Sequence, residues 1–169
     1  MSLIVFTGNG KGKTTAALGQ VFRALGRGWK CCVLQFIKSD TATGEALFAS
    51  GQQFLDFKSL GVGFVFPGED PEPHRKAARA AWLQAAQVLS SGAYRLVVLD
   101  ELTYLCSLGF LRTEEILRVF RERPAGVHVV VTGRNAPPEL IEAADIATEM
   151  REIKHFFSEG HTAEEGIEY

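Results

Sequence analysis

The sequence has few of the features that mark secreted, metal-binding or membrane proteins. Its three cysteines are odd in number, and none has the C-x-x-C spacing of a metal or redox motif. Cys31 and Cys32 are adjacent in an apolar segment, so free thiols in a reducing compartment are favoured over a disulfide. The four histidines have no zinc-type pairing. These absences argue against a disulfide scaffold and against a structural zinc site.

Long apolar runs and a strong charge bias are also missing. No segment approaches the roughly 18 consecutive apolar residues of a membrane-spanning helix. A strand-like run at residues 3–6 stands where a secretory signal would lie. We therefore expect a cytoplasmic protein that does not enter a membrane. The formal net charge of −2 gives the chain no overall affinity for nucleic acid.

What the sequence does contain is an alternation of apolar runs with segments of helical periodicity. This alternation predicts a mostly parallel sheet with helices on both faces, in one domain over residues 1–169. The expected strands are 3–7, 31–36, 54–60, 96–99, 127–132 and 146–149. The expected helices are 13–26, 44–49, 71–90, 113–122 and 138–143, and Thr113 is expected to cap the fourth.

A glycine-rich loop follows the first strand and leads directly into the first helix. Glycines let backbone N–H groups turn inward around an anion, and a helix N-terminus adds positive potential at the same place. A lysine in the loop adds a full charge, and a following threonine offers a hydroxyl to a metal ion. The loop therefore predicts a nucleoside triphosphate site in an α/β single-domain P-loop (RecA-like) fold. Its candidate binding residues are Gly8, Asn9, Gly10, Lys11, Gly12, Lys13, Thr14 and Thr15.

The loop departs from the usual pattern at its first position. Counting back from Gly12-Lys13-Thr14 in G-x-x-x-x-G-K-[ST] places Thr7, not glycine, at the start. The first glycine falls one residue late, so the loop is in effect one residue tighter. The grip on phosphate is therefore expected to differ from that of an ordinary nucleotide hydrolase.

A pair of acids ends the apolar strand 96–99. Beside a phosphate loop, Asp100 and Glu101 lie where a carboxylate is needed to hold Mg²⁺. Successive strand residues point in opposite directions, so one acid is expected to face the metal and the other to orient a neighbour. Capping of the next helix is the alternative. Arg134 follows another strand and either reaches phosphate or lies on the surface.

Together these residues resemble the P-loop type of ATP:corrinoid (cob(I)alamin) adenosyltransferases. The segment from Phe6 to Ala17 is similar to the phosphate loop of that family. Four further stretches agree in order along nearly the whole chain: Gln35-Phe36-Ile37-Lys38, Leu99-Asp100-Glu101-Leu102-Thr103-Tyr104, Thr132-Gly133-Arg134, and Lys154-His155-Phe156 with the ending Gly166-Ile167-Glu168-Tyr169.

The resemblance implies transfer of the 5′-deoxyadenosyl group of ATP to the Co(I) of a corrinoid, with release of inorganic triphosphate. ATP would lie in the reverse sense to most P-loop proteins, which suits the tight loop. Lys13 would neutralise charge on the leaving group, with Glu101 as the second catalytic residue. Thr14 and Glu101 would bind Mg²⁺ or Mn²⁺, supported by Asp100. Phe64 and Phe66 would lie beneath the corrin and favour loss of its lower axial ligand; ordinary core alternation is the alternative.

The resemblance also suggests a reduced flavoprotein as electron donor and a homodimer. The chain starts at the first strand, without the N-terminal extension that covers the active site in some relatives, so we expect closure from elsewhere, such as the C-terminal tail. Two other functions fit the loop alone. One is a P-loop kinase or phosphotransferase, and the other is a nucleotide-gated binding module.

Overall fold

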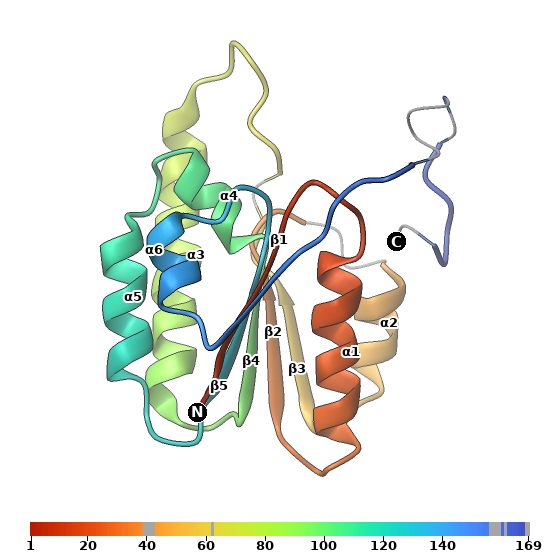
Figure 1. The fold of residues 1–169 in the computed structure, drawn as a ribbon, viewed down its shortest axis with the longest axis vertical. Coiled ribbons are helices and arrows are strands. Elements are labelled where there is room, and N and C mark those ends of the chain that lie inside the picture. The colour runs from red at the N-terminus through yellow and green to blue at the C-terminus, as the bar shows by residue number, and fades with distance from the viewer. Residues whose placement is uncertain (39–42, 62, 156–159, 161, 168–169) are drawn as a thin grey trace.

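The computed structural model describes residues 1–38, 43–61, 63–155, 160 and 162–167. Within these residues, six strands form one sheet in the order β3-β2-β4-β5-β1-β6 (Figure 1). Every pairing is parallel, which confirms the predicted sheet. The strands are β1 (Leu3–Thr7), β2 (Cys31–Gln35), β3 (Leu55–Ser59), β4 (Leu96–Asp100), β5 (His128–Thr132) and β6 (Ile146–Glu149).

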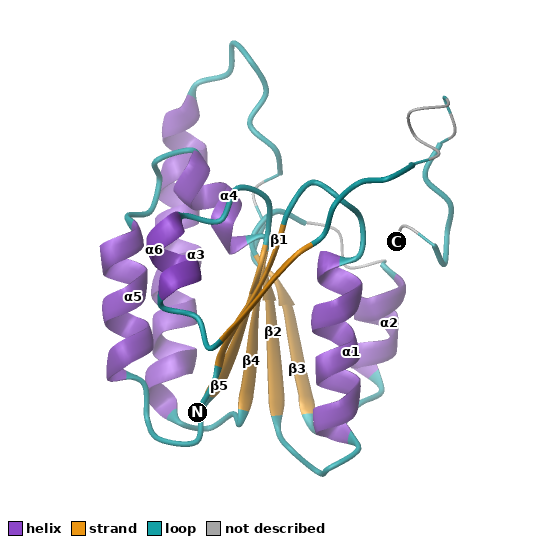
Figure 2. Cartoon of the chain, in the orientation of Figure 1, coloured by secondary structure: helices purple, strands orange, loops and turns teal. Residues whose placement is uncertain are grey.

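Helices cover both faces of this sheet (Figure 2). Two helices, α1 (Lys13–Leu25) and α2 (Gly44–Ser50), pack on one face, where they enclose a smaller apolar core. The other face carries the larger core and four helices: α3 (Pro71–Ser91), α4 (Leu102–Ser107), α5 (Thr113–Glu122) and α6 (Pro138–Glu142). Strands β2 and β4 are buried along their whole length because helices lie on either side of them.

Small and aromatic side chains let the long helix α3 lie close to the sheet. Ala78, Ala81 and Ala85 are buried, and between them Trp82 packs edge-on against Phe120 of α5 with ring centroids 6.4 Å apart. Burial of aromatic side chains of this size stabilises a core by about 3–5 kcal/mol each, judged by truncation to alanine. The larger core thus holds α3 and α5 firmly against the sheet.

Three details differ from the sequence-based expectations. Helix α4 was not predicted, because its six residues are too few to establish a helical period. Thr113 is the first residue of α5 and does not cap it; Arg112 holds the capping position without a side-chain bond. Phe22, which falls on the apolar stripe expected for α1, is 74 % exposed, while Ala17, Val21 and Ala24 form the buried face.

Because all strands are parallel, their carboxyl ends meet along one edge of the sheet (Figure 1). Ligands of such sheets bind beyond that edge. The loops that follow β1, β2, β4 and β5 converge there, and β5 separates β1 from β4. Across the described part of the chain, no helix combines the length and hydropathy that crossing a bilayer requires.

Candidate active site

The phosphate loop joins β1 to α1 at the carboxyl edge of the sheet. Gly12 adopts a φ of 108°, which favours glycine, and Lys13 begins the helix directly after it. The Lys13 side chain is buried and folds back over the loop, where Nζ donates to the carbonyl of Gly10 over 2.8 Å. The lysine is thus held within the concave side of the loop, next to the positive N-terminus of α1.

The backbone that follows β6 packs directly behind this loop. The Gly10 N–H donates to the Met150 carbonyl over 2.7 Å, and the Met150 N–H donates to the Thr7 carbonyl over 2.8 Å. A Cβ atom on Gly8 would lie 2.3 Å from the Met150 carbonyl oxygen, and one on Gly10 would lie 2.7 Å from Arg151 backbone. Glycine is required at both positions by this close approach. The N–H of Gly10 is therefore directed at Met150, and not at the cleft as the sequence suggested.

The acid pair at the end of β4 splits into two roles. Asp100 is 1 % exposed, and its Oδ1 accepts from Thr14 Oγ1 over 2.9 Å and from Thr132 Oγ1 over 2.7 Å. Glu101 has left-handed backbone with a φ of 61°, which is uncommon outside glycine. Its N–H donates to Thr132 Oγ1 over 2.9 Å, so one hydroxyl on β5 stabilises both acids. Backbone strain of this kind is frequent at functional sites.

The charges in this region act strongly on one another. Burial raises the pKa of Glu101, and the neighbouring Asp100 carboxylate raises it further. Burial lowers the pKa of Lys13, although Glu101 and Asp100 oppose that effect. Arg134 carries its positive charge close enough to both groups to lower each pKa. An anionic ligand beside Lys13 and a cation beside Glu101 would each favour the charged form of the side chain it contacts.

The donor set of the acid pair suits a hard divalent cation. Thr14 and Glu101 offer a hydroxyl and a carboxylate to the cleft, and the Asp100 carboxylate lies beneath them, bonded to Thr14. Mg²⁺ prefers such oxygen ligands. In the described residues, no group of three or more His, Cys, Asp or Glu side chains could hold a metal ion alone.

The loops enclose an open cleft of about 950 Å³ at the carboxyl edge. Most of the predicted nucleotide residues line it, as do Glu101 and Arg134. Asp100 and Gly8 do not appear in its lining; Asp100 lies directly beneath it, bonded to Thr14. The residues that line the cleft are Asn9, Gly10, Lys11, Gly12, Lys13, Thr14, Thr15, Leu18, Lys38, Gly44, Glu45, Phe64, Glu101, Arg134, Glu152, His155, Gly166 and Ile167.

Sequence reasoning assigned no role to several of these residues. Lys38 and Glu45 form an ion pair across the cleft wall, with Nζ 2.7 Å from Oε1. Thr132 and Met150 support the site from behind. Their neighbours in space come from other strands, so no local pattern marks them. The available sequence signals were the resembling stretches that contain Lys38 and Thr132 and the apolar run before Thr132.

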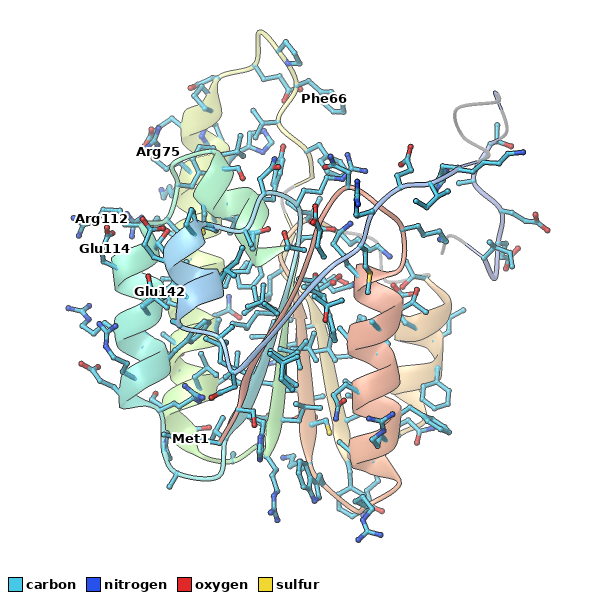
Figure 3. All side chains as sticks on the ribbon, viewed as in Figure 1. Met1, Phe66, Arg75, Arg112, Glu114 and Glu142 are labelled. Atoms are coloured by element: carbon cyan, nitrogen blue, oxygen red, sulfur yellow. The ribbon has the colours of Figure 1, made fainter. Side chains whose placement is uncertain are left out.

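The two phenylalanines are exposed, so they do not form the alternating core pattern. Phe64 is 58 % exposed and lines the cleft, with its ring edge-on to Tyr104 at 5.6 Å between centroids. Phe66 is 62 % exposed on the loop that rises above the carboxyl edge (Figure 3). Val65 between them packs against the larger core, and its N–H donates to Tyr104 Oη over 3.3 Å. Phe64 thus presents its ring to the cleft, whereas Phe66 is exposed on the same loop and is not among the residues that line the cleft.

The last resembling stretch lies only partly within the described residues. His155 lines the cleft, and Lys11 Nζ donates to the Ile167 carbonyl over 3.0 Å, so the tail contacts the phosphate loop. Phe156, Glu168 and Tyr169 lie outside the described residues. The expectation that the tail closes the site therefore stays a prediction, supported by the contact at Lys11.

Three features define a P-loop nucleotide-binding protein: a glycine loop with a buried lysine after β1, an acid pair at the end of β4 on the far side of β5, and a cleft above both. The model of the family ATP:corrinoid adenosyltransferase BtuR/CobO/CobP matches residues 1–169. The chain is 45 % identical over 168 residues to a corrinoid adenosyltransferase of Pseudomonas aeruginosa, covering 99 % of this chain and 83 % of that protein. It is 40 % identical over 167 residues to a corrinoid adenosyltransferase of Escherichia coli, covering 99 % and 85 %.

A third relative agrees with these two. The corrinoid adenosyltransferase CobA of Salmonella typhimurium is 38 % identical over 167 residues, which cover 99 % of this chain and 85 % of that protein. The chain therefore belongs to the ATP:corrinoid adenosyltransferase family.

Proposed function

We propose that this chain transfers the 5′-deoxyadenosyl group of ATP to the cobalt of a reduced corrinoid. The Co(I) of the substrate attacks C5′ of the ribose, so that a Co–C bond forms and the C5′–O bond breaks. The triphosphate leaves with the electron pair of the broken bond. One observation carries this proposal: in a member of this family, the phosphate loop, Glu101 and the exposed Phe64 line the same cleft.

The phosphate loop binds and orients the leaving group. Asn9 to Thr15, which line the cleft, surround the triphosphate, and Gly8 supports them from behind against Met150. Lys13 compensates the negative charge that gathers on the triphosphate as the C5′–O bond breaks. Burial lowers the pKa of Lys13, so bound triphosphate also stabilises the charged lysine. Arg134, on the cleft wall, adds a second positive charge. These residues act by position and charge, because the substrate supplies the nucleophile.

The acid pair would hold a divalent cation at the triphosphate. Thr14 and Glu101 would bind Mg²⁺, or Mn²⁺, and Asp100 supports Thr14 from beneath through its bond to the Thr14 hydroxyl. When bound, the cation would supply positive charge that stabilises triphosphate as a leaving group. The left-handed backbone of Glu101 supports this role, because it directs a carboxylate to the cleft at the end of a buried strand.

The exposed phenylalanines form the corrin-facing part of the site. Phe64 from the cleft and Phe66 from the loop above it would exclude water from one face of the corrin. An apolar face favours loss of the lower axial ligand, and four-coordinate cobalt is more easily reduced to Co(I). The exposure of both rings supports this role, because burial would otherwise stabilise them.

The family and the composition support further proposals on the domain, the assembly, the location and the electron donor. We propose one P-loop domain over residues 1–169, acting as a homodimer in the cytoplasm with a reduced flavoprotein as electron donor. All three cysteines are free thiols, which supports a reducing compartment.

Product analysis tests the function directly. The protein is incubated with ATP, Mg²⁺ and chemically reduced corrinoid without oxygen, and the phosphate species and corrinoid are separated. Inorganic triphosphate with a light-sensitive alkylcobalt is the expected result, and Lys13→Ala should form neither while keeping its fold. ADP or inorganic phosphate would instead indicate a phosphotransferase, and ATP binding without turnover would indicate a binding module.

A further inference from the structure

Gln35 is a buried amide in a row of polar side chains across the carboxyl edge of the sheet. It ends β2 and is 1 % exposed. The strand register pairs it with Ser59 on β3 and with Asp100 on β4. Thr132 on β5 continues the row through its bond to Asp100. A fully buried polar side chain needs hydrogen-bond partners, so the partners of Gln35 indicate what it holds in place.

The amide of Gln35 bridges two carboxylates. Its Nε2 donates to Asp100 Oδ2 over 3.1 Å and lies 3.4 Å from Glu45 Oε1. Its Oε1 accepts from Ser59 Oγ over 3.4 Å. Carboxylates only accept and a hydroxyl can donate, so this orientation of the amide is the one that satisfies all three partners. A neutral donor holds both acids without cancelling the charge that each presents elsewhere.

Each carboxylate that Gln35 contacts acts on a different wall of the cleft. Asp100 uses its other oxygen to accept from Thr14, in the phosphate loop. Glu45 holds Lys38 through a 2.7 Å ion pair, and both of these side chains line the cleft. Burial would raise the pKa of Glu45, but the bonds from Lys38, the backbone and Gln35 outweigh it and lower the pKa. Lys38 also acts on Glu101, whose pKa its charge lowers.

Lys38 further connects this wall to the chain that leads into Phe64. The Gly61 N–H donates to the Lys38 carbonyl over 3.1 Å, and the Gly63 N–H donates to the Ile37 carbonyl over 3.1 Å. A Cβ on Gly61 would lie 2.1 Å from the Ile37 backbone, so the two segments are in close contact. The position of Lys38 is thereby fixed at both its backbone and its side chain.

We propose that Gln35 is a positioning residue that sets the two walls of the nucleotide cleft as one unit. It orients Asp100 toward Thr14 on the phosphate-loop wall, and it orients Glu45 so that Lys38 faces the triphosphate from the opposite wall. Lys38 is thereby a further binding residue for the triphosphate. The inference rests on the proposed function only in taking the cleft as an Mg²⁺–ATP site.

Binding of ATP without corrinoid tests this role. Gln35→Met keeps the length of the side chain and removes both donors. Ser59→Ala is the matched control because it removes a bond to the amide oxygen and leaves both donors of Gln35 in place. Calorimetry measures ATP affinity over a range of Mg²⁺ concentrations. In Gln35→Met, we expect the Mg²⁺ concentration for half-maximal tightening of ATP binding to rise roughly ten- to hundred-fold, as for other residues that orient a metal ligand. Ser59→Ala should stay within about threefold of wild type, since its bond is weak and distant from the acids.

Two further variants complete the test. Gln35→Asn keeps an amide but is one methylene shorter, so it cannot bridge both acids. It is the second variant to test if Gln35→Met fails to fold, and it should show the same Mg²⁺ shift. Lys38→Met should weaken ATP binding at least about fivefold with or without Mg²⁺, as expected for loss of one charge-assisted contact.

The proposal is overturned if the Gln35 variants match Ser59→Ala, if they weaken ATP binding equally with and without Mg²⁺, or if wild-type binding ignores Mg²⁺. Lys38→Met with wild-type affinity would also overturn it. These readouts need no corrinoid chemistry, so they are independent of whether adenosyl transfer is observed.

Discussion

Thr132 provides the sharpest test of how the acid pair is built. Its hydroxyl is fully buried, donates to Asp100 and accepts from the N–H of Glu101. Thr132→Val keeps the shape of the side chain and removes both bonds. A hydrogen bond to a charged group contributes about 1.5–3 kcal/mol, and an orphaned buried N–H costs about 1–3 kcal/mol. Because the two losses share one network, we expect a combined destabilisation of about 2–4 kcal/mol.

The matched variant Thr132→Ser keeps the hydroxyl and loses one methyl group, at a cost of about 1 kcal/mol. For a chain of this size, each kcal/mol lowers the melting temperature by roughly 2–4 °C, so thermal unfolding should separate the variants clearly. Thr132→Val should also lose at least about tenfold in kcat, equivalent to 1.4 kcal/mol, since Glu101 would leave its left-handed backbone. If Thr132→Val is as stable and active as Thr132→Ser, the hydroxyl does not organise the acids.

Three other perturbations test separate parts of the structure. Gly10→Ala places a Cβ against the backbone of Met150 and should lower the free energy of unfolding by about 1–3 kcal/mol, measured by urea unfolding. Gly19→Ala, in open space on α1, is the control and should raise it by about 0.5–1 kcal/mol. Equal effects of the two variants would contradict a close contact between the loop and the chain after β6. Burial lowers the pKa of His128, as do the amino terminus, Arg95 and Arg123, so the folded state binds fewer protons there. Stability should therefore fall as pH drops from above the ordinary histidine pKa of about 6.5 through the lower folded value, and His128→Phe should flatten that dependence; an unchanged pH profile would contradict the assignment. Phe66→Ala should slow adenosylation that starts from Co(II) at least about threefold and leave the rate from preformed Co(I) unchanged. The reason is that Phe66 is proposed to act on the reduction of cobalt, which precedes adenosyl transfer. Equal rates from Co(II) for variant and wild type would exclude Phe66 from the reduction step.

Much of the fold was predictable because burial leaves a local pattern. Apolar runs located all six strands within one or two residues, and the fully apolar run before Asp100 correctly indicated a central strand. The glycine loop and the acid pair were found because each follows a strand end. Helix α4 was missed because six residues show no period, and its place is set by packing of Leu102 and Leu105.

The remaining site residues depend on register between strands that are distant in sequence. Gln35 meets Asp100 only because β2 pairs with β4 in one particular register. The glycines were read as freeing N–H groups for phosphate, yet Gly10 is also needed for close approach to Met150. Both contacts arise from the assembled sheet, so no local sequence pattern could reveal them.

The position of the bond that breaks in ATP distinguishes adenosyl transfer from phosphoryl transfer. The protein is incubated with Mg²⁺, Co(I) corrinoid and ATP that carries ¹⁸O between C5′ and the α-phosphorus. Mass spectrometry then determines the masses of the phosphate products. Attack at C5′ predicts that all of the label leaves in inorganic triphosphate, with an adenosylated corrinoid formed in equal amount. Label retained on the nucleoside, in ADP or AMP, would contradict the central claim.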